Sequence, residues 1–203
     1  METNEKRTKD WSGNGKSIYV TLGASNHVEE EREENDYYST HKTATEWLCK
    51  LETFSHNILE PACGEGHISK VLEEYGYNVR STDLIDRGYG EGGIDFLKFD
   101  EKVDADIITN PPYKFALEFC EHALDLLTEG HSAWMFVKVQ FLEGKARRKL
   151  FDTKQLKAIY VSTGRIKCAK NGDFEHMNGS AVAYMWAQFT KGYNGQPTVY
   201  WIN

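Results

Sequence analysis

A short apolar segment that runs into a glycine-containing turn and then into a helix constrains the fold of this chain most. Residues 57–63 (Asn-Ile-Leu-Glu-Pro-Ala-Cys) have the length and composition of a buried strand. Gly64 and Gly66 follow, and apolar residues recur at helical spacing from Ile68 to Leu72. Such a strand–turn–helix unit is typical of layered α/β folds, in which helices connect parallel strands.

The same alternation continues along the chain. The apolar patterns predict strands at residues 57–63, 78–82, 105–109, 132–141, 156–162, 181–189 and 198–202, and helices at 41–53, around 68–72, at 115–127 and at 143–151. Residues 192–195 (Gly-Tyr-Asn-Gly) separate the last two strands and predict a hairpin. The expected fold class is therefore α/β, with a mostly parallel sheet and an antiparallel pair at its C-terminal edge.

The length of 203 residues favours one globular domain. Residues 1–36 are polar and lack the periodicity of a core, so we expect a mobile arm there and one domain over 37–203. No stretch approaches the about 18 consecutive apolar residues of a membrane span, and no secretory signal is found, so the prediction is a cytoplasmic protein that does not bind membranes. The four cysteines and seven histidines are scattered, which predicts neither disulfides nor a metal site.

The charge is distributed unevenly. The net charge of −7 argues against a general basic coat for holding nucleic acid. Between residues 143 and 170, however, nine basic residues stand against two acidic ones. Arg147, Arg148 and Lys149 are therefore candidates for contacts to phosphates, and a solvated helix surface is the alternative interpretation.

The glycine turn and the acid after the next strand indicate a nucleoside site. In the Glu60–Gly66 segment, Gly64 and Gly66 let a ligand approach the backbone closely. No Lys-Ser/Thr pair follows, as a phosphate loop requires, and Ser69 stands where the dinucleotide fingerprint has its third glycine, so pyrophosphate is disfavoured. Asp83 closes the next predicted strand, where a carboxylate can accept hydrogen bonds from two ribose hydroxyls.

Two further positions suit the base of such a nucleoside. Asp95 can accept a hydrogen bond from an adenine amino group, while Leu84 or Phe96 packs on the ring. By itself this pattern is weak.

A rigid polar turn follows the predicted strand at 105–109. It consists of Asn110, Pro111, Pro112 and Tyr113. The prolines fix the backbone and remove two N–H donors, so the Asn110 side-chain oxygen and the Pro111 carbonyl can serve as acceptors for an amino group. Tyr113 offers a flat face on which a planar base can stack, an interaction of about 1–3 kcal/mol for a nucleobase.

With these motifs in place, the chain resembles the class I S-adenosylmethionine-dependent amino-methyltransferases, in particular the DNA N6-adenine enzymes with the Asn-Pro-Pro-Tyr signature. The resemblance covers roughly residues 37–190, has the gamma order of motifs, and extends to short members found in phages and mobile elements. It implies a Rossmann-like methyltransferase sheet. It also implies that cofactor contacts come from Tyr38, Thr40, Glu60, Ala62, Gly64, Gly66, Asp83, Leu84, Asp95, Phe96 and Asn110.

The resemblance implies direct transfer of the sulfonium methyl group to the N6 of adenine, with Asn110, Pro111, Pro112 and Tyr113 as the catalytic turn and Phe174 as a second aromatic residue on the base. Larger members carry a target-recognition domain, whereas only about 60 residues follow Leu142 here. A partner subunit for target recognition, or an unpaired substrate strand, is compatible with that difference. Three alternatives remain. The chain is an RNA adenine methyltransferase, a protein glutamine methyltransferase, or a non-catalytic accessory subunit that binds the cofactor or nucleic acid.

Overall fold

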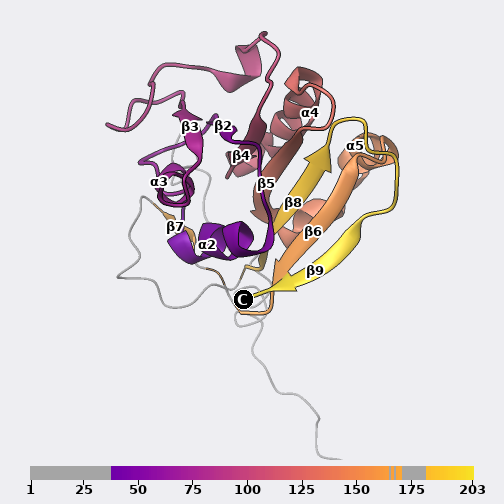
Figure 1. The fold of residues 1–203 in the computed structure, drawn as a ribbon. Coiled ribbons are helices and arrows are strands. Elements are labelled where there is room, and N and C mark those ends of the chain that lie inside the picture. Colours follow the sequence, from indigo (N-terminus) through magenta and orange to yellow (C-terminus); the bar gives the residue numbers. More distant parts are fainter. Residues whose placement is uncertain (1–37, 165, 167, 171–181) are drawn as a thin grey trace, which may run out of the picture. The chain divides into compact units, whose positions relative to one another are not determined.

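A seven-stranded mixed sheet forms the centre of the computed structural model, which describes residues 38–164, 166, 168–170 and 182–203 (Figure 1). The chain divides into two units, Met1–Arg32 and Glu33–Asn203, and all described residues belong to the second. The strands of the sheet are β2 (Asn57–Glu60), β3 (Asn78–Ser81), β4 (Asp106–Thr109), β5 (Ser132–Lys138), β6 (Leu156–Ser162), β8 (Tyr184–Thr190) and β9 (Thr198–Ile202).

The strand order is β3-β2-β4-β5-β8-β6-β9. The first four strands are parallel, β8 is antiparallel to β5 and β6, and β9 is parallel to β6. The prediction of a mostly parallel sheet with antiparallel strands toward the C-terminal edge is therefore confirmed.

The predicted hairpin between the last two strands is wrong, because β6 lies between β8 and β9. All seven residues of β8 are buried, and such a strand requires a neighbour on each side. The strands β5 and β6 occupy those two sides, so β9 pairs with the outer side of β6.

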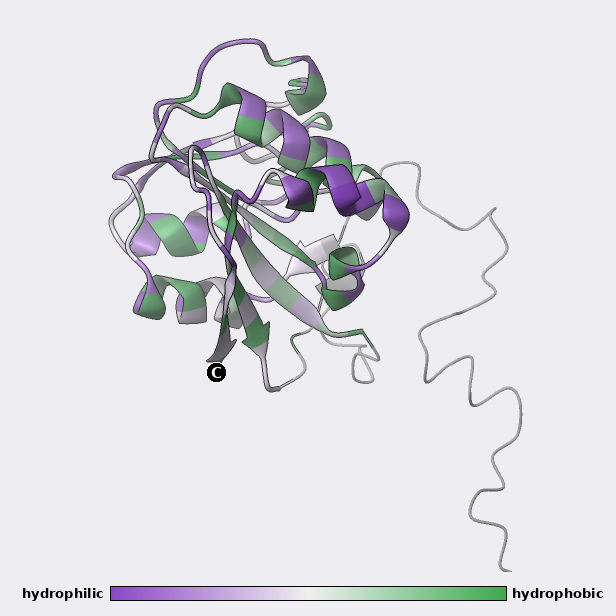
Figure 2. Cartoon of the chain, turned by 90° about the vertical axis from the view of Figure 1, so that its right-hand side faces the viewer, coloured by the Kyte–Doolittle hydropathy of each residue, from purple (hydrophilic) through white to green (hydrophobic). Residues whose placement is uncertain are grey.

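Helices cover both faces of the sheet. They are α2 (Lys42–Leu51), α3 (Ser69–Glu74), α4 (Ala116–Leu126) and α5 (Arg148–Asp152), with short 3-10 turns η2 (Phe96–Lys98), η3 (Tyr113–Phe115), η4 (Val139–Leu142) and η5 (Lys145–Arg147). One core cluster contains α2 and α3 residues, and the other contains α4 residues. Hydrophobic and hydrophilic bands alternate along the helices, as expected of amphipathic elements (Figure 2).

Alternation along β5 divides its side chains between the two clusters. Trp134 and Phe136 belong to the cluster with α2 and α3, whereas Met135 and Val137 belong to the cluster with α4. This strand is therefore buried on both faces, as is typical of the centre of an α/β sheet.

A second, two-stranded sheet was not expected from the sequence. It consists of β1 (Tyr38–Thr40), which pairs antiparallel with β7 (Cys168–Lys170).

Two predicted elements differ in extent from those in the structure. The strand predicted at 132–141 ends at Lys138. The helix predicted at 143–151 begins only at Lys145, because Gly144 has a φ of 106°, outside the helical region, and it consists of η5 followed by α5. No helix in the described part of the chain is long and apolar enough to cross a membrane.

Candidate functional site

The predicted motifs follow three strands that run parallel, so they meet at one edge of the sheet. The glycine turn follows β2, Asp83 follows β3, and the Asn-Pro-Pro-Tyr turn follows β4. Ligand sites of open α/β sheets lie outside the carboxyl ends of the strands. The structure brings these segments together in the place that the fold favours for a ligand.

The glycine turn is held in shape by its neighbours. Gly64 and Gly66 have φ angles of 56° and 79°, in the left-handed region that favours glycine. A Cβ on Gly66 would lie 2.4 Å from the ring of Tyr89, so this position has no room for a side chain. The Cys63 N–H donates to the Thr82 carbonyl at 3.0 Å, which fixes the turn to the end of β3.

Asp83 connects this turn to its own loop. Its Oδ2 accepts a hydrogen bond from the Gly64 N–H at 2.8 Å, and its Oδ1 accepts one from the Ile85 N–H at 2.9 Å. A carboxylate has about four acceptor positions, so two such bonds leave capacity for the hydroxyls of a ligand. The sequence prediction placed Asp83 and the glycine turn in one site, and the hydrogen bond brings them together.

Glu60 has a different environment from the one expected of a ligand contact. Its carboxyl group is buried, and its Oε2 accepts a hydrogen bond from the Ser69 hydroxyl, which is 2.6 Å from the Ser81 hydroxyl. Burial raises the pKa of Glu60 well above its usual value. The side chain therefore joins β2, α3 and β3 beneath the turn, in surroundings that disfavour its charged form.

Replacing Glu60 with glutamine is expected to make the protein less sensitive to alkaline pH. The folded state holds the Glu60 proton more tightly than the unfolded state, so wild-type stability falls as the pH rises above the unfolded pKa of about 4.3. The neutral amide does not titrate. Thermal unfolding should show a higher Tm for Glu60→Gln than for wild type near neutral and alkaline pH, and little difference in acid.

Glu74→Gln is the matched control for this experiment, because Glu74 is exposed at the end of α3. The difference in Tm between Glu74→Gln and wild type should not grow as the pH rises. An identical pH dependence of Tm for the two variants would contradict a raised pKa of Glu60 in the folded protein.

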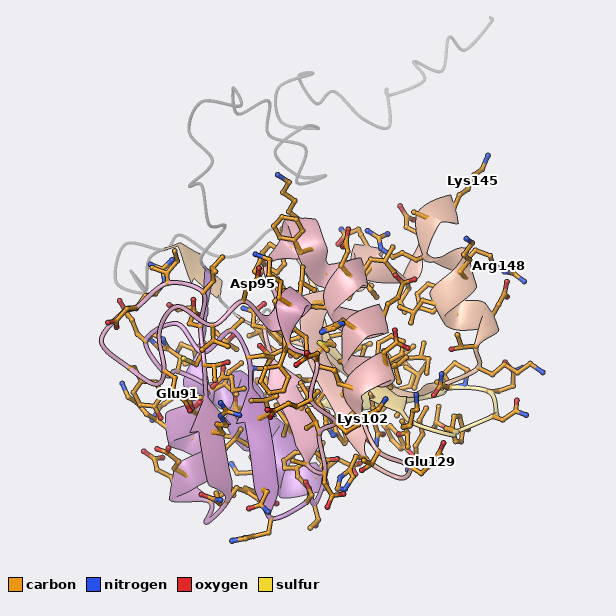
Figure 3. All side chains as sticks on the ribbon, turned by 90° about the horizontal axis from the view of Figure 1, so that it is seen from above. Glu91, Asp95, Lys102, Glu129, Lys145 and Arg148 are labelled. Atoms are coloured by element: carbon orange, nitrogen blue, oxygen red, sulfur yellow. The ribbon has the colours of Figure 1, made fainter. Side chains whose placement is uncertain are left out.

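The candidate contacts to the adenine differ in their exposure and in their partners. They are Leu84, Asp95 and Phe96. Leu84 is 54% exposed, whereas Phe96 is only 3% exposed and its ring packs 4.9 Å from that of Phe119. Asp95 accepts a hydrogen bond from the Leu97 N–H at the start of η2 and pairs with Lys98 at 3.0 Å. Figure 3 labels Asp95, which lies at the start of η2. Leu84 is thus the accessible apolar residue of this group, and the Phe96 ring belongs to the core.

The Asn-Pro-Pro-Tyr turn extends β4, whose four residues are all buried. The Asn110 Nδ2 donates to the Thr40 Oγ1 at 3.0 Å, so β1 fixes the orientation of the amide. The Pro112 carbonyl accepts a hydrogen bond from the Phe115 N–H at 2.8 Å. Within the described part of the chain, no donor forms a hydrogen bond with the Pro111 carbonyl. The turn therefore presents an oriented amide beside a carbonyl acceptor.

Two residues near Tyr113 were missed by the sequence analysis. The Lys138 ammonium lies 4.3 Å from the centroid of the Tyr113 ring, and the Tyr184 ring lies 6.0 Å from it. Lys138 and Tyr184 are cross-strand partners on β5 and β8. Their signal in the sequence was the alternation in β5, which places Lys138 on the same face as Phe136, the ring on which Tyr184 stacks at 5.4 Å.

The remaining candidates are only partly described. The Tyr38 backbone lies in β1, beside Thr40, and Ala62 lies on the glycine turn. Phe174 lies outside the described residues.

The three basic candidates differ in their partners. The Arg147 guanidinium donates to the Glu143 carbonyl and lies 4.8 Å from the Phe141 ring. Arg148 pairs with Asp152 at 2.7 Å, and Lys149 is exposed.

Comparisons with known proteins give structural but not sequence relatives. No family model and no curated protein matches the chain. A solved structure assigned as a modification subunit of a type I restriction enzyme from Vibrio vulnificus is similar with a TM-score of 0.58 and 14% identity over 91% of this chain and 50% of that one. The chain thus spans half the length of that subunit.

Two other solved structures are similar. One, from Listeria monocytogenes, is assigned as a class I S-adenosylmethionine-dependent methyltransferase, with a TM-score of 0.58 and 14% identity over 92% of this chain and 71% of that one. The other, from Pyrococcus horikoshii, is assigned as an RNA methyltransferase, with a TM-score of 0.55 and 13% identity over 88% of this chain and 99% of that one. At these identities the likeness shows the fold, and the chain has the Rossmann-like methyltransferase fold.

Proposed function

We propose that this chain is an S-adenosylmethionine-dependent methyltransferase that methylates the exocyclic N6 of adenine in DNA. The fold supports this reaction class and this cofactor, since structural neighbours are class I methyltransferases. One observation carries the finer proposal. It is the oriented Asn110 amide in an Asn-Pro-Pro-Tyr turn, at the same sheet edge as Asp83 and the glycine turn.

The residues at the edge fit S-adenosylmethionine. Asp83 has acceptor capacity for the ribose hydroxyls, and it already holds the glycine turn beside which the nucleoside would lie. Leu84 is the exposed apolar residue for one face of the adenine, and the Asp95 carboxylate can accept a hydrogen bond from its amino group. When bound, this cofactor supplies a methyl group on a positively charged sulfur.

The chain's own residues would prepare the acceptor. The Asn110 side-chain oxygen and the Pro111 carbonyl would accept the two hydrogens of the amino group, which directs the nitrogen lone pair toward the methyl group. Tyr113 would stack on the base, with Lys138 and Tyr184 beside it. The amino nitrogen would gain the methyl group as the methyl–sulfur bond breaks, and it would release one of its protons to water, so no covalent bond between enzyme and acceptor is required.

RNA is the second candidate acceptor, and a specific observation favours it. The chain covers 99% of the Pyrococcus protein, which is assigned as an RNA methyltransferase. Purified protein should therefore be incubated with labelled S-adenosylmethionine and separately with DNA, RNA and protein extract. We expect N6-methyladenine by mass spectrometry in the DNA sample, and methyl transfer to RNA or protein alone would contradict the DNA assignment.

The Asp83→Ala variant is expected to bind S-adenosylmethionine more weakly. Loss of hydrogen bonds to a charged group costs about 1.5–3 kcal/mol, which corresponds to about 10- to 150-fold in affinity. Isothermal titration calorimetry measures the change. Asp86→Ala is the matched control, because Asp86 is exposed in the same loop and accepts a local hydrogen bond from the Gly88 N–H. Equal affinity in Asp83→Ala and wild type, or tighter binding of NAD, would contradict the cofactor site.

Charge reversal of Arg147, Arg148 and Lys149 is expected to weaken nucleic-acid binding for all sequences and to reduce its dependence on salt. Lys149 should give the largest single effect, since Arg147 and Arg148 already have partners within the chain. Fluorescence anisotropy over a range of salt concentrations measures both quantities, with Lys50→Glu as a control on α2. An unchanged salt slope in the triple variant would show that this segment does not contact phosphates.

A further inference from the structure

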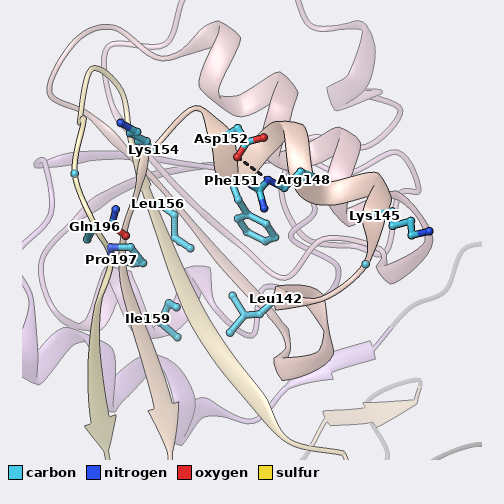
Figure 4. A pocket seen from close by; sticks show the side chains of 12 residues that line it. Leu142, Lys145, Arg148, Phe151, Asp152, Lys154, Leu156, Ile159, Gln196 and Pro197 are labelled. Carbon is cyan, nitrogen blue, oxygen red and sulfur yellow. Dashed lines mark hydrogen bonds and ion pairs between the residues drawn. The ribbon is translucent and has the colours of Figure 1, made fainter.

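A groove of about 920 Å³ lies between α5, the strand β6 and residues 195–197, which lead into β9 (Figure 4). It contains no residue of the glycine turn or of the Asn-Pro-Pro-Tyr turn. Figure 4 shows Leu142, Phe151, Leu156 and Ile159 around its centre. Apart from Arg148, a candidate for phosphate contacts, the lining residues of this groove have no role in the proposed methyl transfer.

The apolar floor of the groove continues across β9. Ile159 is paired with Val199, and Val161 with Trp201, so all four side chains lie on the same face of the sheet. Val199 is 42% exposed and Trp201 is 69% exposed. Contiguous exposed apolar surface of this kind is typical of an interaction site.

Among the described residues, no strand covers the outer side of β9. In that part of the chain β9 is the last strand of the sheet and pairs with β6 alone. Residues 192–203 contain no charged side chain, although edge strands in monomeric proteins usually carry charges. This edge therefore has the character of a strand that is covered in a complex.

The margins of the groove are basic. Lys145 and Lys154 stand at opposite sides in Figure 4, and Arg148 lies between them. The one acidic residue of the lining, Asp152, is already paired with Arg148. Among the described residues, no carboxylate forms an ion pair with Lys145 or Lys154. On a chain with a net charge of −7, this combination fits an anionic occupant.

We infer that the groove and β9 bind a segment of a different protein that combines apolar side chains with aspartate or glutamate. The apolar floor disfavours nucleic acid, whose outer surface is charged phosphate. A second copy of this chain is disfavoured because a symmetric contact places the same surface on both sides, and the one acidic residue of this surface, Asp152, is already paired with Arg148. This inference is independent of the acceptor that is methylated.

The test selects peptides from a random library displayed on phage. Phage that bind the Lys145→Glu/Lys154→Glu variant are removed first, and the remaining phage are then selected for binding to the full wild-type chain. We expect the enriched peptides to combine Leu, Ile, Phe or Trp with Asp or Glu. In fluorescence anisotropy, an enriched peptide should bind the wild type at least about tenfold more tightly than Lys145→Glu/Lys154→Glu or Trp201→Ser.

Lys50→Glu/Lys102→Glu is the matched control, since it changes the charge equally at two exposed positions outside the groove. It should leave the peptide affinity unchanged, and Trp201→Ser should leave methyl transfer unchanged. Failure to enrich peptides over the variant, enrichment of basic peptides, or equal affinity in all variants would overturn the inference. Binding of an oligonucleotide that is lost in Trp201→Ser, or light scattering that shows a wild-type dimer and a Trp201→Ser monomer, would do so as well.

Discussion

Replacing Asn110 with alanine is expected to abolish most methyl transfer and to leave the affinity for S-adenosylmethionine nearly unchanged. The amide oxygen would act on a nitrogen whose geometry changes in the transition state, so its loss should lower kcat rather than binding. Removal of one such preorganised contact costs about 10²- to 10³-fold in kcat. Steady-state kinetics with labelled cofactor and calorimetry measure the two quantities separately.

Two further variants examine the same geometry. Thr40→Val removes the oxygen that accepts the Asn110 Nδ2 hydrogen and should lower kcat less than Asn110→Ala, because the amide remains but loses its orientation. Tyr113→Ala should raise KM as well, since stacking is present already in the bound complex. Substantial activity in Asn110→Ala, or a methyl group on a ring carbon, would overturn the mechanism.

Trp186→Ala is expected to lower the free energy of unfolding more than any of the other substitutions named above. Trp186 is fully buried, its ring lies 4.9 Å from that of Phe136, and its Nε1–H donates to the Ala44 carbonyl at 3.0 Å. Truncation of a buried tryptophan costs about 3–5 kcal/mol, against a total free energy of unfolding of about 5–15 kcal/mol. Urea denaturation followed by circular dichroism measures this difference.

Trp201→Ala is the matched control for that experiment, because it makes the same change at a position that is 69% exposed on β9. It should alter the free energy of unfolding by about 0.5 kcal/mol or less. Similar losses in the two variants would show that Trp186 does not link α2 to the sheet as the structure indicates.

The parallel half of the fold could be predicted because its signals are local. Each strand is a short apolar run, and Gly64, Asp83 and Asn110 follow directly after three of these runs. Parallel strands bring such positions to one edge, so the site followed from the order of elements alone. The position of β8 could not be predicted in this way, since Gly192 and Gly195 permit either a hairpin or a longer crossover. Burial on both sides of β8 decides between them.

The details of the site depended on contacts between distant residues. Glu60 was expected to contact the cofactor, but whether a carboxyl group at a strand end faces a ligand or Ser69 depends on the packing of α3. Lys138 and Tyr184 meet only because β5 and β8 pair in antiparallel register. The alternation within β5 indicates the face on which Lys138 lies, but only the pairing with β8 places Tyr184 beside it.

The central position of β8 has a consequence for synthesis of the chain. β8 occupies the space between β5 and β6, yet it follows both in sequence, and Ser132 meets Thr190 across 58 residues. While the ribosome is translating that interval, the apolar strand β5 has an open edge, which β8 covers in the folded chain. Contacts of such sequence separation form slowly and leave strand edges available to other chains. Nascent chains that stop before residue 190 should therefore be prone to aggregation.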